Sequence, residues 1–480
     1  MSVDTNNAAF QDALNLIQYT RQSVFLTGKA GTGKSTFLRY VCEHTKKKHV
    51  VLAPTGIAAI NAGGSTMHSF FKLPFYPLLP DDPNLSLQRG RIHEFFKYTK
   101  PHRKLLEQIE LVIIDEISMV RADLIDAIDR ILRVYSHNLR EPFGGKQLLL
   151  VGDVFQLEPV VKNDEREILN RAYPTPYFFS ARVFSQIDLV SIELQKVYRQ
   201  TDSVFVSVLD HIRTNTAGAA DLQLLNTRYG SHIEESEADM YITLATRRDT
   251  VDSINEKKLA ELAGEPITFE GSIEGDFPES SLPTSQELVL KPGAQIIFIK
   301  NDFDRRWVNG TIGVIAGIDE EEETIYVITD DGKECDVKRE SWRNIRYRYN
   351  EKTKEIEEEV LGSFTQYPIR LAWAITVHKS QGLTFSRVVI DFTGGVFAGG
   401  QAYVALSRCT SLDGIQLKKP INRADIFVRP EIVNFAGRFN DRQAIDKALK
   451  QAQADVQYAA AARAFDKGDM EECLEQFFRA

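Results

Sequence analysis

The sequence has few cysteines and no long apolar run. Its 480 residues include only Cys42, Cys335, Cys409 and Cys473, which lie far apart and form no C-x-x-C pair. This spacing argues against a disulfide framework or a zinc site, and it suits a reducing compartment. No apolar stretch reaches the ~20 residues that a membrane-spanning helix needs. The first residues lack the basic and apolar segments of a signal peptide, so we expect no membrane association.

An excess of positive charge is also absent. The formal net charge is −9, so no overall positive field attracts nucleic acid. A local basic groove is enough to bind a single strand, however, and the charge balance therefore does not exclude a DNA partner. The composition, 43% hydrophobic and 26% charged, is that of an ordinary globular protein. The length corresponds to about three domains.

A glycine-rich loop follows the first apolar strand pattern. Val24–Leu26 leads into Gly28-Lys-Ala-Gly-Thr-Gly33-Lys34-Ser35, and a helical pattern begins at Thr36. This is the G-x-x-x-x-G-K-[ST] motif, whose backbone N–H groups face phosphate oxygens beside a helix N-terminus. The alternative is a tight glycine turn with a surface lysine. We interpret the segment as a nucleoside triphosphate site in which Lys34 reaches the β- and γ-phosphates and Ser35 binds Mg²⁺.

Two further apolar strand patterns also end in polar residues. Leu111–Ile114 precedes Asp115 and Glu116, and Leu148–Val151 precedes Gln156 by a few positions. In open α/β sheets, ligands collect at the carboxyl ends of the strands. We expect Asp115 to hold Mg²⁺, Glu116 to deprotonate the attacking water, and Gln156 to sense the γ-phosphate. The plain alternative for Gln156 is an exposed side chain.

The segment after residue 49 combines a strand with proline and aromatic residues. The strand pattern His49–Ala53 ends just before Thr55 and Gly56, which the sheet edge therefore brings near a ligand. Three prolines between positions 74 and 80 exclude a helix there. The aromatic residues are either base-stacking platforms or the core of a small subdomain, and we favour the core. They are Phe70, Phe71, Phe75 and Tyr76.

The chain changes character at about residue 270. Residues 270–362 carry short β-forming runs, turn signals and many charges, a pattern typical of a small all-β barrel inserted in an α/β chain. Cations and aromatic residues mix there and either bind nucleic acid or decorate the barrel, and both alternatives stay open. These residues are Arg305, Arg306, Trp307, Trp342, Arg346 and Arg348. From about residue 430 the pattern is helical, and residues 459–480 look like one tetratricopeptide-style helix pair without a repeat.

Taken in order, the motifs resemble those of superfamily 1 helicases of the Pif (petite integration frequency) and RecD-like branch. The resemblance extends from Gln11 to Asp413, nearly the whole chain. The helix pattern at 123–133 looks like the Pif-type signature helix, whereas Thr246-Arg247 departs from the Thr-Asn that similar proteins often carry. The motifs are Gly28–Thr36, Ala53–Ala59, Thr66–Phe71, Asp115–Ser118, Phe143–Gly145, Gly152–Gln156, Tyr198–Arg199, Val377–Thr384 and Tyr403–Arg408.

The resemblance implies an α/β fold of two tandem RecA-like P-loop domains with ATP between them. The first domain is expected over residues 1–188, with a small wedge subdomain at about 66–100. The second is expected over 189–268 and 363–430, split by an SH3-like barrel at 269–362, and a C-terminal helical extension fills 431–480.

The same resemblance implies roles for individual residues. From the second domain, Arg199 and Arg408 reach the γ-phosphate, and they complete a catalytic set of Lys34, Glu116, Gln156, Arg199 and Arg408. Ser35 and Asp115 are expected to hold Mg²⁺. The ATP-binding residues are Gln11, Gly28, Gly31, Thr32, Gly33, Lys34, Ser35, Thr36 and Gly382. The DNA-binding residues are Thr55, Gly56, Thr66, His68, His378 and Lys379, although the two histidines have a structural alternative.

The implied activity is an ATP-dependent DNA helicase that moves 5′ to 3′ on single-stranded DNA in repair, recombination or genome maintenance. Expected partners are single-stranded and tailed duplex DNA, with G-quadruplexes and RNA–DNA hybrids as further candidates. We expect a monomer in isolation, in a bacterial-type cytoplasm. The rival interpretations are a RecD-like motor subunit of a recombination complex, a translocase that does not separate strands, and an ATP-regulated single-stranded DNA-binding protein.

Overall fold

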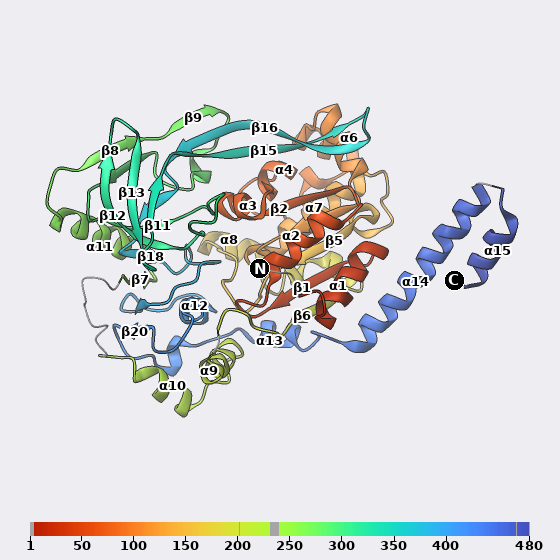
Figure 1. Ribbon diagram of the computed structural model, residues 1–480. Coiled ribbons are helices and arrows are strands. Elements are labelled where there is room, and N and C mark those ends of the chain that lie inside the picture. Colours follow the sequence, from red (N-terminus) through yellow and green to blue (C-terminus); the bar gives the residue numbers. More distant parts are fainter. Residues whose placement is uncertain (1–3, 201, 231–239, 467, 480) are drawn as a thin grey trace.

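The computed structural model describes residues 4–200, 202–230, 240–466 and 468–479. Two parallel sheets organise most of the chain, and antiparallel strands inserted within the chain of the second sheet form a third region (Figure 1). We call the parts around the parallel sheets the first unit (α1–α8, β1–β6) and the second unit (α9–α12, β7, β18–β20). The antiparallel strands β8–β17 form the inserted region.

The first unit is built on a six-stranded parallel sheet in the order β3-β2-β4-β5-β1-β6. The central strands are buried along their whole length, as their continuous apolar sequences indicate for a sheet covered on both faces. The strands are β1 Val24–Gly28, β2 His49–Ala53, β3 Ser65–Thr66, β4 Leu111–Ile114, β5 Gln147–Val151 and β6 Val190–Leu194.

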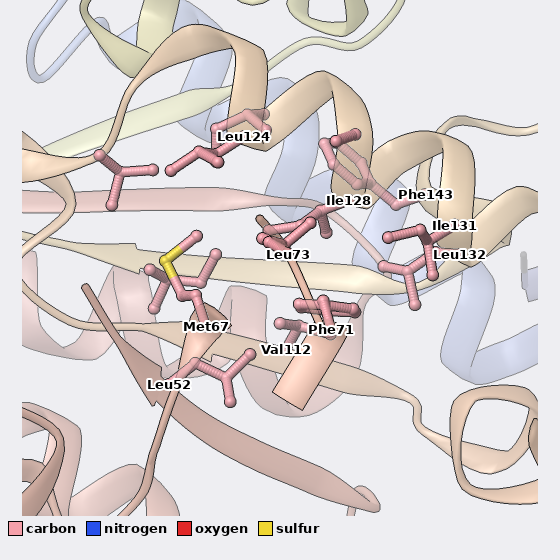
Figure 2. Close-up of a cluster of buried hydrophobic side chains, with 14 of the residues drawn as sticks. Leu52, Met67, Phe71, Leu73, Val112, Leu124, Ile128, Ile131, Leu132 and Phe143 are labelled. Atoms are coloured by element: carbon pink, nitrogen blue, oxygen red, sulfur yellow. The ribbon is translucent and has the colours of Figure 1, made fainter. Parts of the chain in front are cut away.

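Helices cover both faces of this sheet. Successive side chains of a strand point to opposite faces, so Phe25 joins the core beneath α7 while its neighbours Val24 and Leu26 join the core beneath α1 and α2. Figure 2 shows the first core, where Ile128 and Leu132 of α7 approach the sheet. The helices are α1 Ala8–Tyr19, α2 Lys34–His44, α3 Gly56–Ala62, α4 Met67–Phe71, α5 Arg91–Phe96, α6 Lys100–Gln108, α7 Ala122–Tyr135 and α8 Asn163–Leu169.

The second unit has a four-stranded parallel sheet in the order β18-β7-β19-β20. The chain leaves this sheet after β7, forms the inserted region, and returns at β18, which pairs with β7. The strands are β7 Ile242–Ala245, β18 Ala374–Thr376, β19 Val388–Asp391 and β20 Ile415–Leu417. The helices are α9 Ser203–Arg213, α10 Ala219–Asn226, α11 Arg248–Glu261 and α12 Gln401–Leu406.

The inserted region consists of antiparallel sheets. A five-stranded sheet runs β14-β13-β12-β11-β17, and because β17 pairs with β11 this sheet extends beyond residue 362, where the sequence placed its end. A pair, β10-β8, and a three-stranded sheet, β15-β16-β9, complete the region. The strands are β8 Ile267–Glu270, β9 Ser272–Gly275, β10 Glu287–Leu290, β11 Gln295–Phe298, β12 Ile312–Asp319, β13 Thr324–Thr329, β14 Glu334–Val337, β15 Glu340–Asn350, β16 Glu355–Gln366 and β17 Ile369–Leu371.

Three of the six cations and aromatic residues singled out in the inserted region, Arg306, Trp307 and Trp342, contribute to its own fold. Trp307 and Trp342 are buried. Arg306 forms ion pairs with Asp302 and Asp336, and it stacks over the Trp307 ring. These contacts support the structural alternative for these three residues.

A long hairpin of β15 and β16 ties the inserted region to the first unit. It contacts α3 and β3 and reaches α6 (Figure 1). Ile345, Tyr347 and Tyr349 of β15 are buried in the same core as α4 and α7. The Tyr347 hydroxyl lies 3.3 Å from the Val51 N–H, which donates to it. The insertion is therefore anchored on both units.

The proline-rich segment divides its aromatic residues between core and solvent. No helix forms over residues 73–80, as the prolines predicted. Phe70 and Phe71 are buried, but Phe75 is 80% exposed and Tyr76 is 51% exposed. The core interpretation is right for the first two and wrong for the other two, because only the first two lie on a helix, α4, that packs against the sheet. Phe75 instead stacks on His68.

The C-terminal region is helical. It comprises α13 Pro430–Ala436, α14 Arg442–Asp466 and α15 Met470–Arg479, so the expected helix pair begins earlier than residue 459. Ile445 and Ala448 of α14 join the core beneath α1, after which α14 leaves the body of the molecule and α15 runs back beside it (Figure 1). Within the described ranges, no helix combines the length and hydropathy that crossing a membrane requires.

Candidate functional site

The glycine-rich loop joins β1 to α2 and touches the second half of the chain. Gly31 and Gly33 have φ angles of +79° and +91°, in the left-handed region that favours glycine. A Cβ on Gly31 would stand 2.4 Å from the Cβ of Arg199. The Tyr198 N–H donates to the Gly31 carbonyl at 2.9 Å. Glycine at position 31 thus allows the segment with Arg199 to lie directly on the loop.

Lys34 is held inside the loop. Its ammonium donates to the carbonyls of Gly28 at 2.8 Å and Lys29 at 3.0 Å. Removal from bulk water lowers the pKa of Lys34, and the carboxylates of Asp153 and Glu116 oppose that shift. A phosphate bound in the loop would stabilise the charged form of this lysine.

A cavity of about 590 Å³ lies between the two units at this loop. Its walls come from the loop, from the carboxyl ends of β4 and β5, and from the second unit. The structure therefore brings together predicted site residues as far apart in the sequence as Gly31 and Arg408. The predicted site residues that line it are Gly31, Thr32, Gly33, Lys34, Ser35, Thr36, Asp115, Glu116, Gln156, Arg199, Gly382 and Arg408.

Two carboxylates face this cavity from the end of β4. Burial raises the pKa of Asp115, and burial together with the neighbouring Asp115 raises the pKa of Glu116 to about 7. Mg²⁺ usually takes one or two protein carboxylates and completes its shell with water and substrate phosphates. The Ser35 hydroxyl and the Asp115 carboxylate fit such a shared site. Among the described residues, no cluster of three or more His, Cys, Asp or Glu forms a metal site.

Two arginines face the cavity from the opposite side. Arg408 is 2% exposed, and it donates to the carbonyls of Val404 at 3.0 Å and Ser380 at 3.3 Å. Arg199 donates to the carbonyls of Ser407 at 3.5 Å and Gly382 at 3.4 Å. Burial lowers the pKa of both guanidinium groups. Within the described ranges neither forms a salt bridge, so an anion in the cavity would supply the missing counter-charge.

Two predicted ATP-binding residues do not line the cavity. The Gln11 amide donates to the Thr5 carbonyl at 2.6 Å, and its contact with ATP stays a prediction. Its neighbours Asn7 and Phe10 do line the cavity. Gly28 acts through its carbonyl, which accepts from Lys34, and a Cβ there would stand 2.6 Å from the Thr32 hydroxyl.

Sequence reasoning missed several residues around the loop. Ala30 N–H donates to the Tyr403 hydroxyl at 3.0 Å, and Lys29 forms an ion pair with Asp210. Asp153 lies buried against Arg213. Arg213 is simply the last residue of an amphipathic helix pattern, and no local signal marks it. Tyr403 lies within a recognised motif, which could have identified it.

The predicted DNA-binding residues of the first unit follow β2 and β3. Thr55 and Thr66 cap α3 and α4, accepting from the Ala58 and Ser69 N–H groups at 3.2 Å and 3.1 Å. Gly56 packs against the inserted region, since a Cβ there would stand 2.4 Å from the Ser281 hydroxyl.

The two predicted DNA-binding histidines have similar surroundings. His68 in α4 stacks on Phe75 with ring centroids 4.8 Å apart, and His378, just after β18, lies parallel to Phe397 at 6.4 Å. Both phenylalanines are exposed, and Lys379 is exposed beside His378. Polar and aromatic groups therefore lie at the carboxyl edges of both sheets. Their contact with DNA stays a prediction.

Comparison with known proteins agrees with this geometry. Residues 4–217 match the model of the PIF1-like helicase family. The chain is 33% identical over 412 residues to the ATP-dependent DNA helicase Pif1 of Campylobacter jejuni, covering 82% of this chain and 88% of that protein.

Solved structures of Pif1 helicases are also similar to this chain. A crystal structure of Bacteroides sp Pif1 in complex with ADP-AlF4 has a TM-score of 0.83 and 41% identity, covering 91% of this chain and 97% of that one. Bacteroides Pif1 bound to single-stranded DNA has a TM-score of 0.65 and 40% identity, covering 92% of this chain and 99% of that one. With its motifs, its cavity and these relatives in agreement, the chain belongs to the PIF1-like helicase family.

Proposed function

We infer that this chain is an ATP-dependent DNA helicase. The observation that carries the inference is the two-sided cavity, with Lys34, Glu116 and Gln156 on one unit and Arg199 and Arg408 on the other. Relatives across most of the chain are ATP-dependent DNA helicases, and structural relatives hold ADP-AlF4 or single-stranded DNA.

Each of the cavity residues has a separate role in the proposed hydrolysis of ATP. Lys34 binds the β- and γ-phosphates, and Glu116 takes the proton of the attacking water that Gln156 helps to orient. Ser35 and Asp115 would hold Mg²⁺, which neutralises phosphate charge when bound. Arginines that reach the transferred phosphate contribute ~10³–10⁵ in rate in well-studied NTPases.

The same arginines link hydrolysis to movement. With ATP bound, Arg199 and Arg408 attach the second unit to the γ-phosphate, and hydrolysis removes that attachment, so the cavity opens. Alternating contacts of the two units with one strand then give one step in each cycle. We place single-stranded DNA across both sheets, along Thr55, Gly56, Thr66, His68, His378 and Lys379, and we propose movement 5′ to 3′.

The proposal also assigns a role or a fold type to two smaller parts of the molecule. We propose that residues 66–100 act as a wedge that separates strands and that the inserted region is a barrel of the SH3 type. Tailed duplexes are the expected substrates, G-quadruplexes and RNA–DNA hybrids are further candidates, and the expected form is a monomer in a bacterial-type cytoplasm.

A strand-displacement assay tests the activity and its direction together. Duplexes with either a 5′ or a 3′ single-stranded tail are incubated with ATP and Mg²⁺. We expect displacement of the 5′-tailed substrate alone. Displacement of only the 3′-tailed substrate would contradict the direction. DNA-stimulated phosphate release without displacement would point to a translocase, and DNA binding without phosphate release would point to a binding protein.

A further inference from the structure

Helix α9 of the second unit contacts two separate parts of the ATP site. Asp210 forms an ion pair with Lys29 of the glycine-rich loop. Arg213 forms an ion pair with Asp153, which follows β5, at 3.1 Å. Residues three apart lie on the same face of a helix, so one face of α9 contacts both the loop and the segment that carries Gln156.

Arg213 is deeply buried between acidic groups. Its side chain is 4% exposed and pairs with Asp153 and also with Glu193 of β6, at 2.9 Å. The guanidinium lies 4.4 Å from the centroid of the Phe155 ring. Burial by itself would lower the pKa of Arg213, but the carboxylates outweigh it and raise that pKa. Arg213 is therefore a permanent charge whose partners both belong to the other unit.

Asp153 connects this charge to the proposed phosphate sensor. Its side chain is completely buried. One carboxylate oxygen lies 3.4 Å from the Gln156 amide nitrogen, which donates to it, and both oxygens accept from Arg213. The same carboxylate acts electrostatically on Lys34. A shift of Arg213 would therefore change the orientation of Asp153, and with it the position of Gln156.

We propose that Arg213 is a positioning residue that couples the second unit to the γ-phosphate side of the ATP site through Asp153 and Gln156. Separating Arg213 from Asp153 would leave the buried Asp153 carboxylate without its ion-pair partner, which is strongly unfavourable. The placement of Gln156 and the approach of the second unit are therefore linked. This inference rests on the proposed function, because it assigns Gln156 a part in ATP hydrolysis.

The test compares Arg213→Met with Glu193→Gln as a matched control. Both changes affect the same buried ion cluster, but Glu193 lies on β6 and pairs with Arg213, whereas Asp153 is the member that accepts from Gln156. We expect Arg213→Met to lower the DNA-stimulated kcat for ATP by at least tenfold with KM within about twofold, and Glu193→Gln to keep kcat within about twofold. Equal losses of kcat in the two variants, parallel to losses of thermal stability, would show a purely structural role and overturn the proposal.

A double-mutant cycle that combines Arg213→Met with Gln156→Ala tests whether Arg213 acts through Gln156. If Arg213 acts through Gln156, the double variant is no slower than Gln156→Ala alone. If the loss of kcat in the double variant were the product of the two single losses, the two residues would act independently and the proposed action of Arg213 through Gln156 would be overturned. Normal turnover in Gln156→Ala would contradict the proposed function of that residue, whereas a slow Gln156→Ala beside a normal Arg213→Met would contradict this inference alone.

Arg213→Lys keeps the inference testable if Arg213→Met does not fold. Lysine retains the charge but cannot reproduce the fork that bonds both oxygens of Asp153. We expect a folded protein with kcat between those of the wild type and Gln156→Ala. A wild-type kcat in Arg213→Lys would show that a positive charge near Asp153 suffices without the orientation that the guanidinium gives, and would overturn a positioning role.

Discussion

The two sides of the ATP cavity are built in different ways. The first unit supplies a continuous loop and the ends of adjacent strands, so its polar groups are aligned by backbone that is itself regular. The second unit supplies Arg199 and Arg408, whose guanidinium groups are oriented by carbonyls and have no salt bridge among the described residues. One side is a glycine-rich loop that holds Lys34, and the other is a pair of cations to which, under the proposed function, the nucleotide supplies a counter-charge. Binding and hydrolysis should therefore respond differently to changes on the two sides.

Removing the loop lysine should have the largest effect. Lys34→Ala deletes the cation that we propose contacts the transferred phosphate, so we expect ATP turnover to fall to background. Binding of a fluorescent single-stranded oligonucleotide should be unchanged, because the proposed DNA-binding residues do not include Lys34. Turnover that persists in this variant would refute the assignment of the loop.

Removing an arginine on the other side should separate hydrolysis from binding. For Arg408→Ala we expect a loss of ~10³ in kcat with only a small change in nucleotide affinity, measured by titration with a fluorescent ATP analogue. Arg408→Lys is the matched control, and it should recover little, since a lysine cannot reproduce the guanidinium's several hydrogen bonds. An equal loss in affinity and kcat would mean that Arg408 only binds nucleotide.

The close approach of the two sides can be broken at Gly31. Gly31→Ala places a Cβ 2.4 Å from that of Arg199, so we expect turnover to fall on the order of 10²-fold through misplacement of Arg199. Gly63→Ala is the control, because Gly63 has a similar φ of +71° but no atom within 4 Å of an added Cβ. If both variants lose the same activity, backbone strain and not the contact with Arg199 is responsible.

The smallest expected effect concerns the anchor of the inserted region, not the cavity. Burial, with Lys72 nearby, lowers the pKa of His102 in α6 to about 4. Unfolded chains take up a proton on this histidine at about pH 6.5, so the free energy of unfolding should decrease as pH falls from 6.5 to 4. His102→Gln should remove on the order of 2 kcal/mol of that decrease, measured by urea unfolding across this range. If the free energy of unfolding changed with pH in the same way in the wild type and in His102→Gln, the lowered pKa of His102 would be contradicted.

Local sequence was sufficient for the first side of the cavity. The loop, the strand before it and the helix after it are neighbours in the chain, and Asp115, Glu116 and Gln156 each follow an apolar strand. Parallel strands of one sheet end at the same edge, so predicting the strands also predicted the meeting of these residues. The same reasoning failed for Phe75 and Tyr76, because no periodic pattern separates a buried aromatic residue from an exposed one within an irregular segment.

By itself, the amino-acid sequence determined the phosphate loop, the order of the strands and helices around it, and the resemblance to a helicase family. Only the tertiary structure decided that α9 contacts the loop through Asp210 and the segment of Gln156 through Arg213, and that β15 lies in the core of the first unit. Periodicity and motifs predict the local structure of residues that are close together in the sequence. The contacts of α9 and β15 instead join residues 60 to about 300 positions apart, where the stabilisation comes from burial and charge pairing that no local pattern encodes.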